Sequence, residues 1–134
     1  MKCWVQRFFA FASLAAVGCA SFSQTVDITK VRPPYRVVVY DQGGPVLRKE
    51  ITRESEDEAT ITRWLESNKS GWRATPVTYA PKRLIDGDGF SINFLDGGCV
   101  INYSTAGIGN GGVQLYKAIP KENLELSEVF AQNR

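Results

Sequence analysis

Apolar and polar residues alternate in several short stretches of the chain, which is the pattern of β-strands with one buried face. Residues 90–95 read FSINFL and residues 99–103 read CVINY, and the turn sequence DGG separates them. Residues 35–40 and 46–51 are rich in β-branched residues and flank the turn sequence DQGGP. The chain therefore predicts two β-hairpins.

One stretch has the periodicity of an α-helix. Ile61, Trp64 and Leu65 fall at helical spacing and predict an apolar face centred on the tryptophan. Ser55 and Glu58, which precede this face, have the spacing of a capping box, in which each side chain bonds the backbone amide of the other residue. The acidic residues around this first turn also suit the positive end of the helix dipole.

The second half of the chain predicts further strands. Residues 72–81, WRATPVTYAP, are a candidate strand that Pro76 weakens, because proline cannot donate a backbone hydrogen bond. Residues 113–119, VQLYKAI, are another candidate strand. The tail after Pro120 predicts a short helix from four apolar residues, Leu124, Leu126, Val129 and Phe130.

The predicted element order is ββαββββ. Short turns join neighbouring strands, which favours an antiparallel sheet, and one helix is enough to cover one face of it. The predicted fold class is therefore α+β, a two-layer sandwich in one domain of residues 35–134. Residues 19–34 precede this domain and end in Pro33-Pro34, and they predict an extended linker.

The first 23 residues have the three-part layout of a secretory signal peptide. Lys2 and Arg7 form a positive start, an uncharged apolar run of residues 8–17 follows, and small residues come next. The run has about half of the ~20 residues that a helix needs to cross a bilayer. The segment therefore predicts export rather than a permanent membrane span.

Residues 16–19 read AVGC and resemble the lipobox of bacterial lipoproteins, in which small residues lead directly to a cysteine. The resemblance covers only this segment, and the chain has alanine where the commonest pattern has leucine. It implies that residues 1–18 are removed and that Cys19 carries a diacylglyceryl group, which anchors the protein to a membrane in the periplasm. The alternative is an ordinary signal cut after Ser23 or Ala20, which leaves a soluble periplasmic or secreted protein.

The net charge and the cysteine content restrict the partners and the chemistry that this protein can have. The whole chain has 16 basic and 14 acidic residues, and two of the basic residues lie in the signal segment, so the exported part is formally neutral. Nucleic acid is not an expected partner, because no strong basic field remains to attract it. Either signal cut leaves Cys99 as the one free thiol, and its apolar strand predicts a buried structural cysteine.

Three further observations bear on chemistry. The chain contains no histidine, which excludes histidine triads and histidine-ligated zinc. Residues 107–112, GIGNGG, match a dinucleotide-binding motif by letter, but a strand rather than a helix is predicted after them. Residues 86–89, DGDG, begin like a calcium loop and lack its later ligands. We therefore predict no cofactor, no metal site and no catalytic residue.

One segment has the composition of a binding surface. Tyrosine, tryptophan and arginine are enriched where protein partners bind most tightly. Residues 72–83 carry five aromatic or basic candidates, Trp72, Arg73, Tyr79, Lys82 and Arg83. The alternative interpretation is that the aromatic residues pack in the core and the basic residues form an ordinary surface.

Together these features predict a small exported envelope lipoprotein that acts by non-covalent binding, in the periplasm or at a membrane surface. The expected partner is a protein or another envelope component. Two alternatives stay open, a periplasmic inhibitor or immunity-type protein that blocks a toxin or hydrolase, and a histidine-free enzyme that uses carboxylates.

Overall fold

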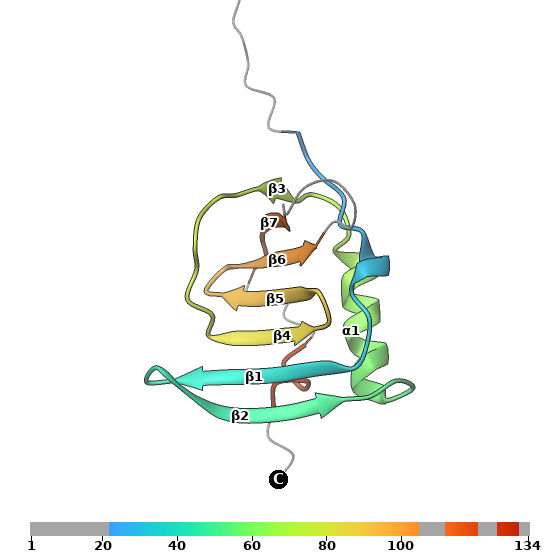
Figure 1. Ribbon diagram of the computed structural model, residues 1–134, viewed down its shortest axis with the longest axis vertical. Coiled ribbons are helices and arrows are strands. Elements are labelled where there is room, and N and C mark those ends of the chain that lie inside the picture. Colours follow the sequence, from blue (N-terminus) through green and yellow to red (C-terminus); the bar gives the residue numbers. More distant parts are fainter. Residues whose placement is uncertain (1–21, 105–111, 121–125, 132–134) are drawn as a thin grey trace, which may run out of the picture.

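The computed structural model describes residues 22–104, 112–120 and 126–131. The described part contains a seven-stranded antiparallel sheet with the strand order β2-β1-β4-β5-β6-β7-β3 and one α-helix (Figure 1). The elements are η1 Ile28–Lys30, β1 Tyr35–Asp41, β2 Gly44–Ile51, α1 Glu56–Ser67, β3 Arg73–Ala74, β4 Arg83–Gly87, β5 Phe90–Leu95, β6 Gly98–Ser104 and β7 Gly112–Ala118. The predicted α+β class is confirmed.

Both predicted hairpins are present. β1 pairs with β2 through a tight turn at Gln42 and Gly43, which both have positive φ, as a hairpin turn that matches the strand twist requires. A register shift in this pair, next to Tyr40, is a β-bulge. β5 pairs with β6 through a turn in which Gly97 has a φ of 87°.

Helix α1 begins where the capping residues predict. Ser55 Oγ accepts a hydrogen bond from the backbone N–H of Glu58 at 3.1 Å. The Glu58 carboxylate accepts from Thr62 Oγ1 at 3.2 Å, one turn further along the helix. The buried face of α1 consists of Ile61, Trp64 and Leu65.

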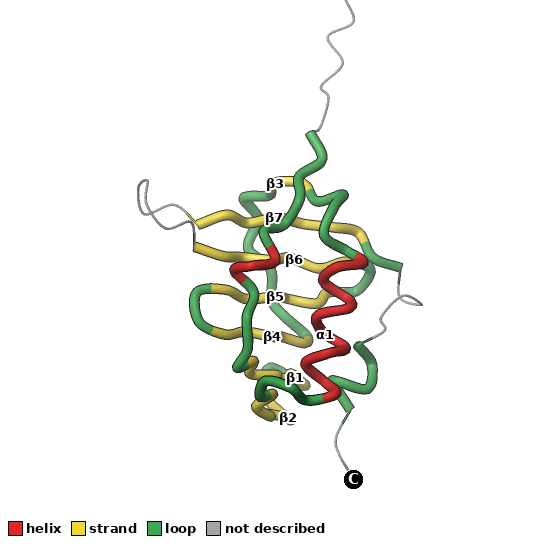
Figure 2. The backbone as a smooth tube through the Cα atoms, turned by 90° about the vertical axis from the view of Figure 1, so that its right-hand side faces the viewer, coloured by secondary structure: helices red, strands yellow, loops and turns green. Residues whose placement is uncertain are grey.

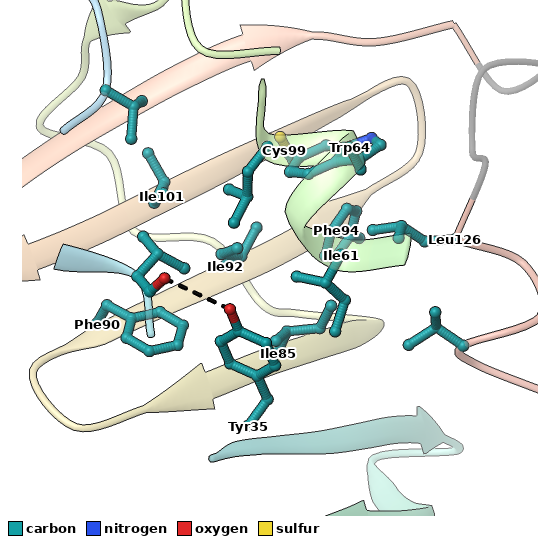
Figure 3. Close-up of a cluster of buried hydrophobic side chains, with 14 of the residues drawn as sticks. Tyr35, Ile61, Trp64, Ile85, Phe90, Ile92, Phe94, Cys99, Ile101 and Leu126 are labelled. Carbon is teal, nitrogen blue, oxygen red and sulfur yellow. Dashed lines mark hydrogen bonds between the residues drawn. The ribbon is translucent and has the colours of Figure 1, made fainter. Parts of the chain in front are cut away.

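Two layers enclose the core. Helix α1 and η1 lie on the same side of the sheet (Figure 2), and the core fills the space between them and the strands. Phe94 of β5 packs against Trp64 of α1, with ring centroids 5.3 Å apart (Figure 3). It also packs against Phe130, with ring centroids 5.2 Å apart. At the other end of the core, Tyr35 packs edge-on against Phe90, and its hydroxyl donates to Val31 O at 3.4 Å.

The second half of the chain differs from the sequence-based expectation. Only Arg73–Ala74 of the candidate strand 72–81 is a strand, because Pro76 and Pro81 cannot donate to a ladder. The chain forms an unpredicted strand, β4, directly after this segment. At the C-terminus, residues 126–131 form a turn rather than a helix, and Leu124 lies outside the described residues.

Residues 22–34 differ from the expected linker, because they pack on the domain. Gln24 and Trp72 exchange two backbone hydrogen bonds of 2.7 and 3.1 Å. Val26 and Val31 are buried in the core, where their apolar side chains stabilise the fold. The folded part of the chain thus extends to Gln24, a few residues after Cys19, which itself lies outside the described residues.

Candidate functional site

One face of the sheet has no helix on it, and we call it the open face. Side chains alternate between the two faces of a strand, and in β1 the buried residues Tyr35 and Val37 point to the core. Arg36, Val38 and Tyr40 therefore point to the open face. Residues that pair across neighbouring strands have their side chains on the same face. The strand register therefore shows which side chains of the other strands point to the open face.

A row of polar side chains crosses the open face. Successive pairings place six residues from six strands in line, Glu50, Arg36, Asp86, Ser91, Asn102 and Gln114. Arg36 and Asp86 form a bidentate pair, with Nε to Oδ1 at 3.1 Å and Nη2 to Oδ2 at 2.9 Å. Asn102 Nδ2 donates to Ser91 Oγ at 3.2 Å. Since the Arg36 side chain is 68% exposed, the ion pair adds little stability, and its groups are accessible to a partner.

A groove lies on the open face over β2, β1 and β4, and we call it the β1 groove. It has a volume of about 410 Å³. Val38 and Leu84 face each other in register and form an aliphatic floor. The open-face residues in its lining are Arg36, Val38, Tyr40, Arg48, Glu50, Leu84 and Asp86. The Arg48 guanidinium makes no hydrogen bond or ion pair with the part of the chain that the structure describes.

Residues 75–82, which we call the strap, run from β3 to β4 (Figure 1) and cover part of the other half of the open face. Tyr79 of the strap stacks on Tyr116 of β7, with ring centroids 6.2 Å apart and planes 12° apart. Gln114 Nε2 donates to Val77 O. Val100 of β6, which points to this face, is buried. The strap therefore shields Val100 of β6 and Tyr116 of β7, and it leaves the β1 groove accessible.

The five binding candidates from the sequence are divided among several places. Trp72 is 1% exposed and belongs to the core, where its Nε1 donates to Asn68 O. The core-packing alternative thus describes Trp72. Tyr79 and Lys82 lie on the strap, and Lys82 pairs with Asp96. The structure places these three residues outside the β1 groove.

Arg73 and Arg83 also lie apart from each other. Arg73 is exposed on β3 and is in register with Tyr116. The Arg83 guanidinium lies over the Phe130 ring, 5.6 Å from its centroid, and covers one end of the core. The aromatic and basic composition of residues 72–83 therefore reflects core, strap and surface roles rather than one patch.

Sequence reasoning missed the residues of the β1 groove. The signal in the sequence was the alternation within residues 35–40. It puts the charged and aromatic side chains of this strand on one face and the buried side chains on the other. Which strand lies beside β1 was not visible, since β4 was not predicted. In the sequence, Asp86 stands out only as the first residue of DGDG, which begins like a calcium loop and lacks its later ligands.

Cys99 is a buried thiol, as the sequence predicted. Burial raises the pKa of Cys99 far above its ordinary value, and the Lys117 ammonium offsets this only in part. The thiol therefore stays protonated and is a poor nucleophile. Among the described residues, no group of three or more cysteine or acidic side chains is arranged to hold a metal ion. No helix within residues 22–104, 112–120 and 126–131 is long and apolar enough to span a membrane.

Comparison of the chain with protein-family models, with curated proteins and with solved structures gave no match in any of the three. The geometry of the open face is therefore the basis on which a function is assigned.

Proposed function

We propose that this protein is an exported envelope protein, anchored to a membrane through Cys19, that binds a partner protein non-covalently through the β1 groove. The observation that carries the proposal is the uncovered aliphatic floor of Val38 and Leu84, framed by arginine and tyrosine side chains. The strap covers part of the neighbouring half of the same face and leaves the floor of this groove uncovered.

The chemistry of the groove suits a protein segment. Tyrosine and arginine are the residue types enriched at energetic centres of protein interfaces, with apolar contact beneath them and polar groups at the rim. Tyr40, Arg36 and Arg48 supply these types here. Because Arg48 has no charged partner among the described residues, it is available to pair with a carboxylate. The expected partner segment therefore presents an apolar side chain to the floor and an acidic side chain to Arg48.

Export is supported by the signal layout of the first 23 residues. The described contacts begin at Gln24, which pairs with Trp72. A cut before Cys19 and a cut after Ser23 therefore both retain every described backbone contact. With the first cut, the five residues from Cys19 to Ser23 span at most about 18 Å, which would hold the domain close to the membrane surface.

Replacing Leu84 by aspartate should strongly weaken partner binding without unfolding the domain. Leu84 lies on the open face, and a carboxylate there would remove the apolar contact of the floor and would compete with the partner's acidic side chain for Arg48. We expect at least a ~10-fold loss of affinity, as for a central interface residue. The matched control is Val77→Asp, which changes an exposed aliphatic residue of the strap.

The measurement has two stages. Proteins captured from an envelope extract by the mature protein are identified by mass spectrometry, and the dissociation constant for the purified partner is then determined by calorimetry. Circular dichroism verifies that both variants are folded. Equal affinity of wild type and Leu84→Asp would overturn the groove as the binding surface.

The membrane anchor makes a separate prediction. The mature protein from the membrane fraction should begin at Cys19 and carry acyl chains, which intact-mass measurement detects. Cys19→Ser should move the protein to the soluble fraction, because the lipid chains provide the attachment. A mature chain that begins at Gln24 and carries no acyl mass would contradict the anchor, and it would leave the groove proposal to its own test.

A further inference from the structure

The two edges of the sheet differ. At one end, β3 has two residues, and the backbone beside it is paired with Gln24 of the N-terminal segment. At the other end, β2 has eight residues and pairs only with β1 among the described residues (Figure 1). A long edge strand with unpaired backbone groups is a template for another strand. The edge of β2 is therefore the place where the sheet can be extended.

The register shows which backbone groups of β2 face outward. Tyr40 N donates to Lys82 O at 2.8 Å, so the even-numbered residues of β1 bond toward β4 and the odd-numbered ones toward β2. From Leu47 onward, after the bulge, the odd-numbered residues of β2 pair with the odd-numbered residues of β1. The N–H and C=O groups of Arg48 and Glu50 consequently point away from the sheet, and both side chains lie on the open face.

We propose that β2 pairs antiparallel with β2 of a second copy of this chain, about a two-fold axis at Lys49. This register places Arg48 opposite Glu50 of the second copy, and the symmetry repeats the pair in the other direction. Centring the axis on Arg48 or on Glu50 would lose both Arg48–Glu50 pairs and would oppose two like charges on the open face, which destabilises a cross-strand pair. Outward-facing backbone groups meet in the proposed register, as an antiparallel ladder requires.

The surrounding charges favour the same register. A row of alternating charges crosses three strands of the open face, from Asp86 through Arg36 to Glu50. Arg48 of the second copy would be next in this row and would place a positive charge beside Glu50. On the opposite face, the two copies of Lys49 would meet at the axis. Each of these ammonium groups has its own carboxylate, since Lys49 Nζ lies 3.0 Å from Asp57 Oδ2.

The bulge and Pro45 limit the length of the proposed ladder. Proline has no N–H to donate, and the register shift next to Tyr40 disturbs the start of the strand. The interface is therefore short, which places the dimer among weak, concentration-dependent assemblies. The floor of the β1 groove is not part of the dimer, but Arg48 belongs to both surfaces, so dimerisation and partner binding would compete for this side chain.

Reversing the charges tests this register. Arg48→Glu and Glu50→Arg, made singly in the mature protein, each oppose like charges at both symmetry-related pairs. Each should raise the dimer dissociation constant about tenfold. The double variant Arg48→Glu/Glu50→Arg restores opposite charges and should recover the dissociation constant of the wild type. Sedimentation equilibrium over a wide concentration range gives these constants, and Val77→Asp on the strap serves as the control that should dimerise like wild type.

A cysteine at position 49 gives a second readout. In the proposed register the two copies of residue 49 form a non-hydrogen-bonded pair with a Cα separation of about 4.5 Å, which is within the range of a disulfide. Lys49→Cys should therefore form a disulfide-linked dimer on oxidation, whereas Val77→Cys on the strap should not. Monomeric wild type at every concentration, or a double variant as weak as the single ones, would overturn the proposal.

Discussion

Replacing Trp64 by alanine is expected to destabilise the domain by about 3–5 kcal/mol, the usual cost of removing a large buried aromatic side chain. Trp64 is fully buried on α1, and its ring lies 5.3 Å from that of Phe94 in the sheet. The helix is the main element that covers the core face, so the cavity would open where the two layers meet. Stabilities of whole domains are about 5–15 kcal/mol, so a loss of this size would remove a large share of the free energy of unfolding.

Urea unfolding followed by circular dichroism measures this effect. Trp64→Phe is the matched control, because it keeps an aromatic ring at the same position. It also removes the indole N–H of Trp64, which is buried and has no hydrogen-bond partner in the described structure, and an unsatisfied buried donor is costly. We expect Trp64→Phe to lose clearly less than Trp64→Ala. An alanine variant as stable as wild type would contradict the assignment of Trp64 to the core.

Gly87→Ala is expected to destabilise the domain by about 1–3 kcal/mol through overpacking. A Cβ at Gly87 would lie 2.5 Å from Phe90 Cε1 and 3.0 Å from the backbone oxygen of Pro34. The Phe90 ring cannot move away easily, because it is buried edge-on against Tyr35. The effect should appear as a lower denaturation midpoint in urea with an unchanged slope.

A control and a double-mutant cycle separate the steric effect from the general cost of changing a glycine. Gly44→Ala has no atom closer than 3.9 Å to its Cβ and should be nearly neutral. Phe90→Leu shortens the ring that Gly87→Ala contacts, so the double variant should lose less stability than the sum of the single variants. Additive losses would show that the clash is not with Phe90.

Local patterns predicted a large part of this fold. Both hairpins could be predicted from their strand and turn residues, because the turn residues lie within a few positions of the strands that they join. Helix α1 followed from the spacing of Ser55, Glu58 and the apolar face. The burial of Cys99 followed from the apolar strand around it.

Other elements could not be predicted, because they depend on contacts between distant segments. Strand β4 has few β-branched residues and forms because β1 and β5 pair with it on both sides. Residues 22–34 have the composition of a linker, and they fold back because Val26 and Val31 find an apolar surface there. The strap resembles a strand in composition, and Pro76 and Pro81 make it a cover instead.

The sequence by itself determined the class of the fold and the sites of its turns and its helix, because alternation, capping and glycine or proline at turns act over a few residues. It also carries the signal segment from which export is proposed. Only the tertiary structure decided which side chains form the proposed binding surface. Arg36 and Asp86, 50 residues apart in the chain, meet because the strand order places β1 beside β4, and no local pattern encodes which strands become neighbours.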